Sequence, residues 1–114
     1  MHKAKPIAIF VVIERGKADV VIRAARCAGA SGATVFFARG TGGQVHMNLF
    51  KIEVEPMKEV VLTIVPEHLA QDVIAAMSAA AHLNRPGTGI LFSMPIESLI
   101  GLEYIDRPIP PEDI

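Results

Sequence analysis

The stretch that decides the fold is PIAIFVVI at residues 6–13, which contains no polar side chain. A short run that is apolar on both faces and rich in β-branched residues predicts a central strand of a sheet. After a turn at residues 14–16, residues 17–28 carry an apolar stripe at helical spacing, and Gly29 stands where a helix commonly ends. Residues 34–38 predict a second strand.

The second half of the chain follows the same order. Residues 59–65 again predict a strand that is apolar on both faces, and a helix begins at residues 66–67 and ends near residues 82–84. Residues 90–94 predict a fourth strand, followed by a short helix or turn at residues 96–100. The order β-α-β-β-α-β predicts an α+β, ferredoxin-like sandwich, in which two helices cover one face of a four-stranded antiparallel sheet.

The predicted strands carry more apolar surface than two helices can cover. In the first strand, Ile7, Ile9 and Val11 alternate with Ala8, Phe10 and Val12, so that both faces are apolar. A monomer would expose one of these faces as a patch larger than soluble monomers usually show. We therefore predict an obligate oligomer in which sheets pack against each other.

Composition excludes several other classes of protein. The 114 residues suit one domain, residues 1–114, and the net charge of −1 with dispersed lysines and arginines predicts no nucleic-acid partner. No apolar run approaches the ~20 residues of a membrane helix, and no cleavage site follows the first apolar run, so we expect a cytoplasmic protein without membrane insertion. The single Cys27 excludes an intrachain disulfide, and its helix of alanines predicts a buried thiol.

Function is expected between the second and third strands. Arg39-Gly-Thr-Gly-Gly-Gln44 places three glycines in four residues, either to let a ligand approach the backbone or only to form a turn. Residues 45–55 alternate between apolar and polar, which predicts a strand pair or extended ribbon. This ribbon is either a hairpin packed on its own oligomer or a finger that docks on a partner through Val45, Met47, Leu49, Phe50 and Ile52.

The titratable side chains predict neither a catalytic nor a metal site. His2, His46, His68 and His82 lack the spacing of a metal motif. The four glutamates that alternate with apolar residues are expected to face outward: Glu53, Glu55, Glu59 and Glu67. No pair of nucleophile and base stands out, so we expect that the protein is not an enzyme.

Several segments, in order, resemble the PII nitrogen-regulatory signalling proteins across residues 6–100. They are Gly32-Ala-Thr-Val35, Arg39-Gly-Thr-Gly-Gly-Gln44, Pro56-Met-Lys-Glu-Val60 leading to Val65-Pro-Glu67, and Gly87-Thr-Gly89 with Phe92 and Pro95. The resemblance implies a homotrimer that binds ATP or ADP between subunits, with Mg²⁺ and 2-oxoglutarate in some states. It also implies control of a target enzyme or transporter through a T-loop, here residues 40–56, beside a B-loop at 83–89 and a C-terminal tail at 96–114.

When the family's ligand residues are carried over by position, the resemblance implies a ligand site in this chain. It comprises Thr34, Arg39, Gly40, Gly42, Gly43, Gln44, Ile64, Arg85, Gly87, Thr88 and Gly89. The sequence departs from the family where phosphates are held. Ile90 replaces a family lysine, and Gly101 and Glu103 stand where the family has arginines. Because a triphosphate needs fixed cations or N–H dipoles, we predict weak binding of ATP and Mg²⁺, with ADP, AMP or another small anion as the effector. No obligatory cofactor is expected.

Two other functions fit the same trimeric scaffold. One is a CutA-like protein that responds to metal ions, and the other is a small enzyme or carrier with His46 or Arg39 in a cleft between subunits.

The predicted T-loop is a few residues shorter than is usual in the PII family and contains no tyrosine, since the only tyrosine is Tyr104. Control by uridylylation of a loop tyrosine is therefore not expected.

Overall fold

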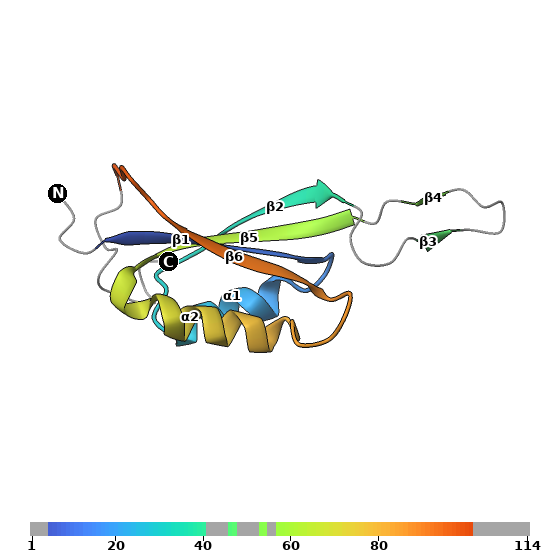
Figure 1. The fold of residues 1–114 in the computed structure, drawn as a ribbon, viewed down its shortest axis with the longest axis horizontal. Coiled ribbons are helices and arrows are strands. Elements are labelled where there is room, and N and C mark those ends of the chain that lie inside the picture. Colours follow the sequence, from blue (N-terminus) through green and yellow to red (C-terminus); the bar gives the residue numbers. More distant parts are fainter. Residues whose placement is uncertain (1–4, 41–45, 48–52, 55–56, 102–114) are drawn as a thin grey trace.

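The computed structural model describes residues 5–40, 46–47, 53–54 and 57–101. Its elements alternate in the predicted order, with a short strand pair inserted between the second and third strands of the main sheet (Figure 1). They are β1 (Pro6–Glu14), α1 (Ala18–Cys27), β2 (Thr34–Arg39), β3 (His46–Met47), β4 (Glu53–Val54), β5 (Met57–Pro66), α2 (Glu67–Ala80) and β6 (Gly89–Pro95).

The main sheet has the strand order β2-β5-β1-β6, and every neighbouring pair is antiparallel. The predicted ferredoxin-like α+β fold is thereby confirmed. The sheet strands extend one or two residues beyond their predicted ends, because each continues as long as its neighbour offers backbone partners. The short helix or turn expected at residues 96–100 is not a helix; only a bend is present there, after the Ile96 amide donates to the carbonyl of Pro6.

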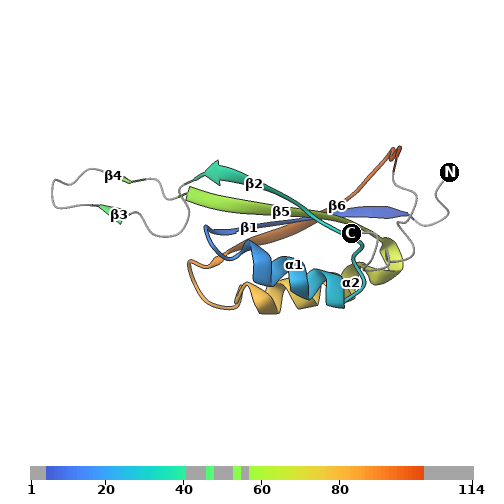
Figure 2. The ribbon, with the colours of Figure 1, turned by 180° about the vertical axis from the view of Figure 1, so that it is seen from behind.

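Both helices lie on the same face of the sheet, as opposite views of the ribbon show (Figures 1 and 2). This face carries the odd-numbered residues of β1 and β5. Most of these side chains are buried, because they pack against residues of α1 and α2 such as Val21, Val73 and Met77, whereas Ile7 is half-buried and Met57, at the start of β5, is exposed. The strand residues with at most 1% exposure are Ile9, Val11, Ile13, Val61 and Val65. They form the core, whose burial is the main stabilising contribution to the fold.

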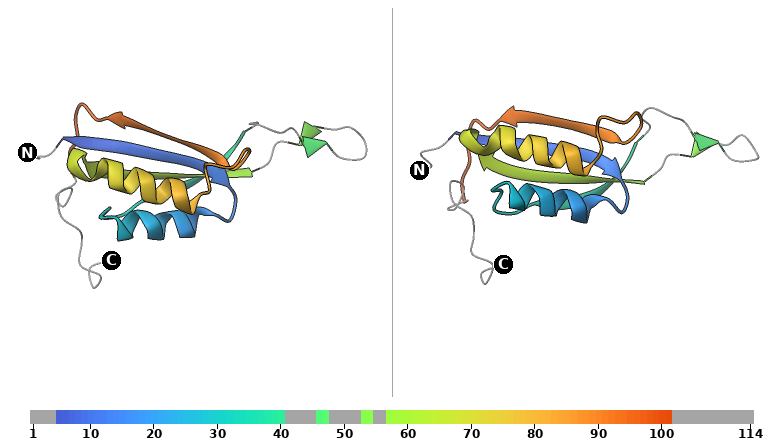
Figure 3. Two further views of the ribbon diagram at one scale, coloured as in Figure 1. Left: turned by 60° about the horizontal axis from the view of Figure 1, so that its bottom comes forward. Right: turned by 90° about the horizontal axis from the view of Figure 1, so that it is seen from below.

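No described segment of the chain covers the opposite face of the sheet, which lies above the strands in Figures 1 and 2, whereas Figure 3 looks onto the face that the helices cover. The strand registers place one continuous apolar surface on this face, which we call the open face. It comprises Ala8, Phe10, Val12, Phe36, Val60, Leu62, Ile64, Ile90, Phe92 and Met94. Four of these side chains are 41–60% exposed, and the rings of Phe10 and Phe92 stack with their centroids 4.9 Å apart. The predicted excess of apolar surface is therefore present.

Two predictions about individual side chains were wrong. Cys27 is exposed, because it is the last residue of α1 and lies away from the stripe formed by Val21 and Ala25. Glu59 is only 9% exposed, and its carboxylate accepts a hydrogen bond from the backbone amide of Gly16. Glu59 pairs with Ile13 of β1. Because side chains alternate between the two faces of a strand, the Glu59 side chain points to the face that the helices cover.

Candidate functional site

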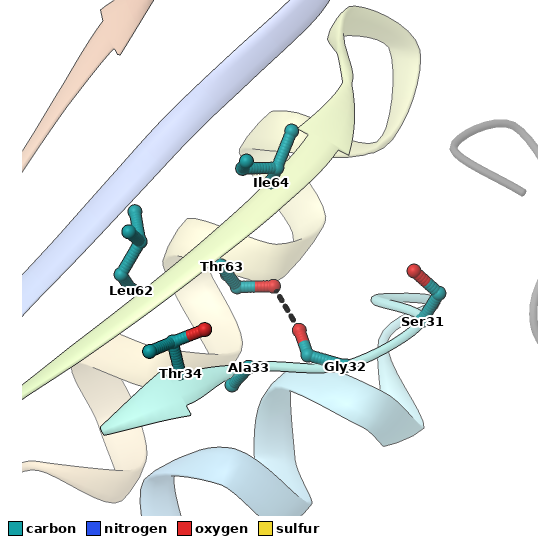
Figure 4. A pocket seen from close by; sticks show the side chains of 7 residues that line it. All are labelled: Ser31, Gly32, Ala33, Thr34, Leu62, Thr63 and Ile64. Carbon is teal, nitrogen blue, oxygen red and sulfur yellow. Dashed lines mark hydrogen bonds between the residues drawn. The ribbon is translucent and has the colours of Figure 1, made fainter. Parts of the chain in front are cut away.

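A pocket with a volume of about 240 Å³ opens where β2 begins (Figure 4). Residues 31–34 form one wall and residues 62–64 of β5 form the other. Thr63 extends toward the first wall, and its hydroxyl donates to the carbonyl of Gly32 over 2.6 Å. Leu62 and Ile64 extend from β5 on the other side, so the pocket borders the open face, and no lining side chain is charged.

The glycine-containing segment begins at the opposite end of β2. Arg39 is the last residue of the strand and is exposed, while Gly40 is half-buried with open space where a Cβ would be. The pair β3 and β4 lies beyond this end, away from both helices (Figure 1). The paired backbone, with His46 opposite Val54, confirms the predicted strand pair.

The connections between this strand pair and the main sheet are unequal. Six residues, 40–45, join β2 to β3, but only residues 55–56 join β4 to β5. The pairing of His46 with Val54 is therefore shifted by four residues from the pairing of Arg39 with Met57. The longer connection is the one that contains the three glycines, and two of them, Gly42 and Gly43, lie outside the described residues.

The B-loop leaves the end of α2 through a left-handed residue. Ala81 caps the helix, the amide of Leu83 donates to the carbonyl of Ser78, and His82 has a φ of 55°. This bonding pattern is a Schellman motif, in which glycine is the usual left-handed residue. The Thr88 hydroxyl lies within 2.8 Å of the His82 carbonyl and 3.0 Å of the Arg85 carbonyl, and it donates to one of them at a time.

Replacing His82 with glycine is expected to stabilise the protein by about 0.5–1 kcal/mol, because a Cβ costs energy at this φ and the exposed imidazole contributes little packing. Thermal unfolding measures the change. The matched control is His68→Gly in the first turn of α2, where the backbone is helical and the same substitution is expected to destabilise by about 1 kcal/mol. An unchanged or lower melting temperature for H82G would show that the His82 side chain contributes more than its exposure indicates.

Gly89 has a structural reason to be glycine that the sequence did not reveal. It is the first residue of β6, with a φ of 150°, and it pairs with Ile13 of β1. A Cβ at this position would overlap the carbonyl oxygen of Val12 and would lie 3.0 Å from Cγ2 of Ile13. The close approach of two backbones therefore accounts for this glycine without reference to a ligand.

One subunit does not bring the predicted ligand residues into one site. Thr34 and Ile64 line the pocket, whereas Arg39 and Gly40 lie at the far end of β2. Gly89 is on β6, at the other edge of the sheet, about 14 Å or three strand spacings from β2. Arg85, Gly87 and Thr88 precede Gly89 in the B-loop. Gly42, Gly43, Gln44, Val45, Leu49, Phe50 and Ile52 lie outside the described residues, and Met47 is described only as part of β3.

Sequence reasoning missed part of the pocket. Gly32 and Thr63 were not predicted as site residues, although their hydrogen bond fixes the start of β2 against β5. The available signal was Thr63, the single polar residue in the run VVLTIV at residues 60–65. In the described part of the chain, no group of three or more metal-ligating side chains forms, and neither helix has the length and apolarity that crossing a membrane requires.

Comparison with known proteins identifies a family that agrees with the ferredoxin-like topology. No curated protein matches the sequence. The family model of the nitrogen regulatory protein P-II, by contrast, matches residues 7–103, which span both helices and all strands of the structure. A match of this extent covers far more than half of the chain. The chain therefore belongs to the nitrogen regulatory protein P-II family, whose members are regulatory signalling proteins.

Proposed function

We propose that the protein is a cytoplasmic homotrimer that binds a small anionic effector between subunits and regulates a partner protein, a transporter or an enzyme, through its T-loop. The observation that carries the proposal is the open face, where the apolar side chains of four strands are left without a cover in the described chain. Burial of such a surface against other copies of the chain is strongly favourable.

The separation of the predicted ligand residues also supports binding between subunits. In a cyclic trimer each contact is heterologous, so that one edge of a subunit meets a different edge of the next. A pocket beside β2 in one copy can then face a loop end in the neighbouring copy. This arrangement would unite Thr34 and Ile64 with cations such as Arg39 or Arg85, which one subunit holds apart.

The side chains around this cleft favour a small charge on the effector. The pocket itself carries no charged residue, and Arg39 and Arg85 are the exposed arginines among the predicted ligand residues. At the start of β6, Ile90 presents an apolar side chain that is 60% exposed. Two arginines suit a mono- or diphosphate better than a triphosphate, because each uncompensated phosphate charge lowers affinity. We therefore propose AMP or ADP rather than Mg-ATP as the effector.

Isothermal titration calorimetry of the wild-type trimer tests this preference. AMP or ADP is expected to bind more tightly than ATP, and Arg85→Ala in the B-loop is expected to weaken AMP binding about ten-fold by removing one cation. Arg23→Ala is the control, because it removes an exposed arginine of α1, on the helix side of the molecule, and should leave the AMP affinity unchanged. Absence of heat with every nucleotide would contradict the proposal, and heat with divalent metal ions alone would favour a metal-responsive protein.

The T-loop is proposed to transmit the effector signal. An effector can shift the loop only by binding more tightly to one loop state than to another. The strand pair β3–β4 supports this role, since it lies beyond the end of the main sheet, away from both helices (Figure 1). Binding of AMP should therefore change the rate at which trypsin cleaves after Lys51, which lies between the two strands. An unchanged cleavage rate at saturating AMP would argue against transmission through this loop.

A further inference from the structure

We propose that the chain's own C-terminal segment, residues 102–114, docks in the pocket formed by residues 31–34 and 62–64, with the Tyr104 ring inserted. The occupant is the segment of the same subunit. The docking itself is independent of effector binding. Its consequence, competition between the tail and the effector for the pocket, rests on the function proposed above.

The chemistry of the pocket suits an uncharged ring with one polar atom. Its volume of about 240 Å³ accommodates one aromatic side chain, and its walls are mainly apolar. The Thr63 hydroxyl already donates a hydrogen bond to the Gly32 carbonyl. The hydroxyls of Ser31 and Thr34 therefore remain as side-chain partners for the phenol of a tyrosine. A tyrosine satisfies both requirements, because its ring is apolar and its O–H both donates and accepts.

Strand β6 ends at the pocket end of the sheet. Met94 of β6 pairs with Ala8, and Ala8 pairs with Ile64 on the other side of β1. A hydrogen bond from the Ile96 amide to the Pro6 carbonyl, 3.0 Å long, holds the chain near this end after β6. Tyr104 is nine Cα-to-Cα steps after Pro95, enough to span about 30 Å, whereas β6 and β5 are about 10 Å apart.

The composition of the tail supports this occupant. The segment LEYIDRPIPPEDI contains large apolar side chains together with three prolines. Prolines restrict the free chain, so that ordering it on a surface costs less conformational entropy. Gly101, with a φ of 102° and open space around its Cα, permits the chain to turn immediately before the tail.

Tyr104 provides its own probe, because the chain has one tyrosine and no tryptophan. Acrylamide quenching of the tyrosine fluorescence in the full-length protein, without any ligand, measures how accessible the ring is. We expect a quenching constant about three-fold lower than that of N-acetyltyrosinamide, since a ring packed in a protein pocket excludes the quencher. A constant equal to that of the free amide would overturn the proposal.

A pocket-filling variant identifies where the ring is protected. Thr34→Phe is expected to raise the quenching constant to that of the free amide, whereas Gln71→Phe on the exposed face of α2 should leave it low. Both variants must retain the oligomeric mass of the wild type. Protection that persists in T34F would place Tyr104 elsewhere and overturn the proposal.

Competition is tested separately by truncation after Gly101. The truncated trimer is expected to bind AMP more tightly than the full chain, because the pocket no longer has an internal occupant. If Tyr104 is protected but truncation leaves AMP affinity unchanged, the docking stands and the pocket is not the effector site. If neither chain binds AMP while Tyr104 is protected, the proposed effector is wrong and the docking is unaffected.

Discussion

A Phe92→Glu variant is expected to be a folded monomer. Phe92, on the edge strand β6, is 41% exposed in the subunit and stacks on Phe10 of the neighbouring strand β1 on the open face, so a glutamate there still reaches water in a single chain. In a trimer, by contrast, the three carboxylates would be buried between sheets without partners. An unpaired buried charge costs several kcal/mol per subunit, which is enough to dissociate the assembly at micromolar concentration.

Sedimentation velocity together with circular dichroism measures this loss. The matched control is Val20→Glu, which also replaces an apolar residue of similar exposure, 45%, but on α1 and therefore on the helix side of the molecule. V20E should remain a trimer with wild-type stability. If F92E sediments as the wild type does, the open face is not the surface that holds the subunits together.

A Gly89→Ala variant is expected to lose about 3 kcal/mol of stability, from backbone strain and forced separation of β6 from β1. The methyl group would meet the carbonyl oxygen of Val12, which is held in the β1–β6 ladder and cannot move aside as a flexible side chain can. The melting temperature should fall by roughly 10–20 °C for a chain of this size.

Gly87→Ala is the control for backbone strain alone. Gly87 also has a positive φ, 78°, but a Cβ there would meet nothing within 4 Å. Thermal unfolding should therefore show a loss of about 1–2 kcal/mol for G87A, the cost of a left-handed non-glycine residue. Equal losses for the two variants would mean that the contact with Val12 relaxes without cost.

The strand and helix order was predictable because the hydrophobic pattern is unusually clear. The first strand, residues 6–13, is apolar on both faces, and this feature alone predicted both its central position in the sheet and the exposed apolar surface. Ile9 and Phe10 are adjacent in sequence, but their side chains lie on opposite faces of the sheet. One face is covered by helices, and the other is not.

Side-chain environments were less predictable, because they depend on partners distant in sequence. Glu59 resembles an outward-facing strand residue, yet the turn at Gly16 supplies a donor that makes its burial possible. The pocket lies between residues 31–34 and residues 62–64, which are adjacent because β2 pairs with β5 in one particular register. That register cannot be read from the sequence. Gly89 was assigned to a ligand loop by resemblance, whereas its contact with Val12 becomes visible only when β1 and β6 are paired.

The family assignment and the fold leave one physical claim at the centre of the account. The open face requires a cover, and other copies of the chain are proposed to provide it. Sedimentation equilibrium of the wild-type protein at low micromolar concentration tests this claim most directly. We expect a single species with three times the 12.2 kDa mass of the chain, and a species of 12.2 kDa would contradict burial of the open face between subunits.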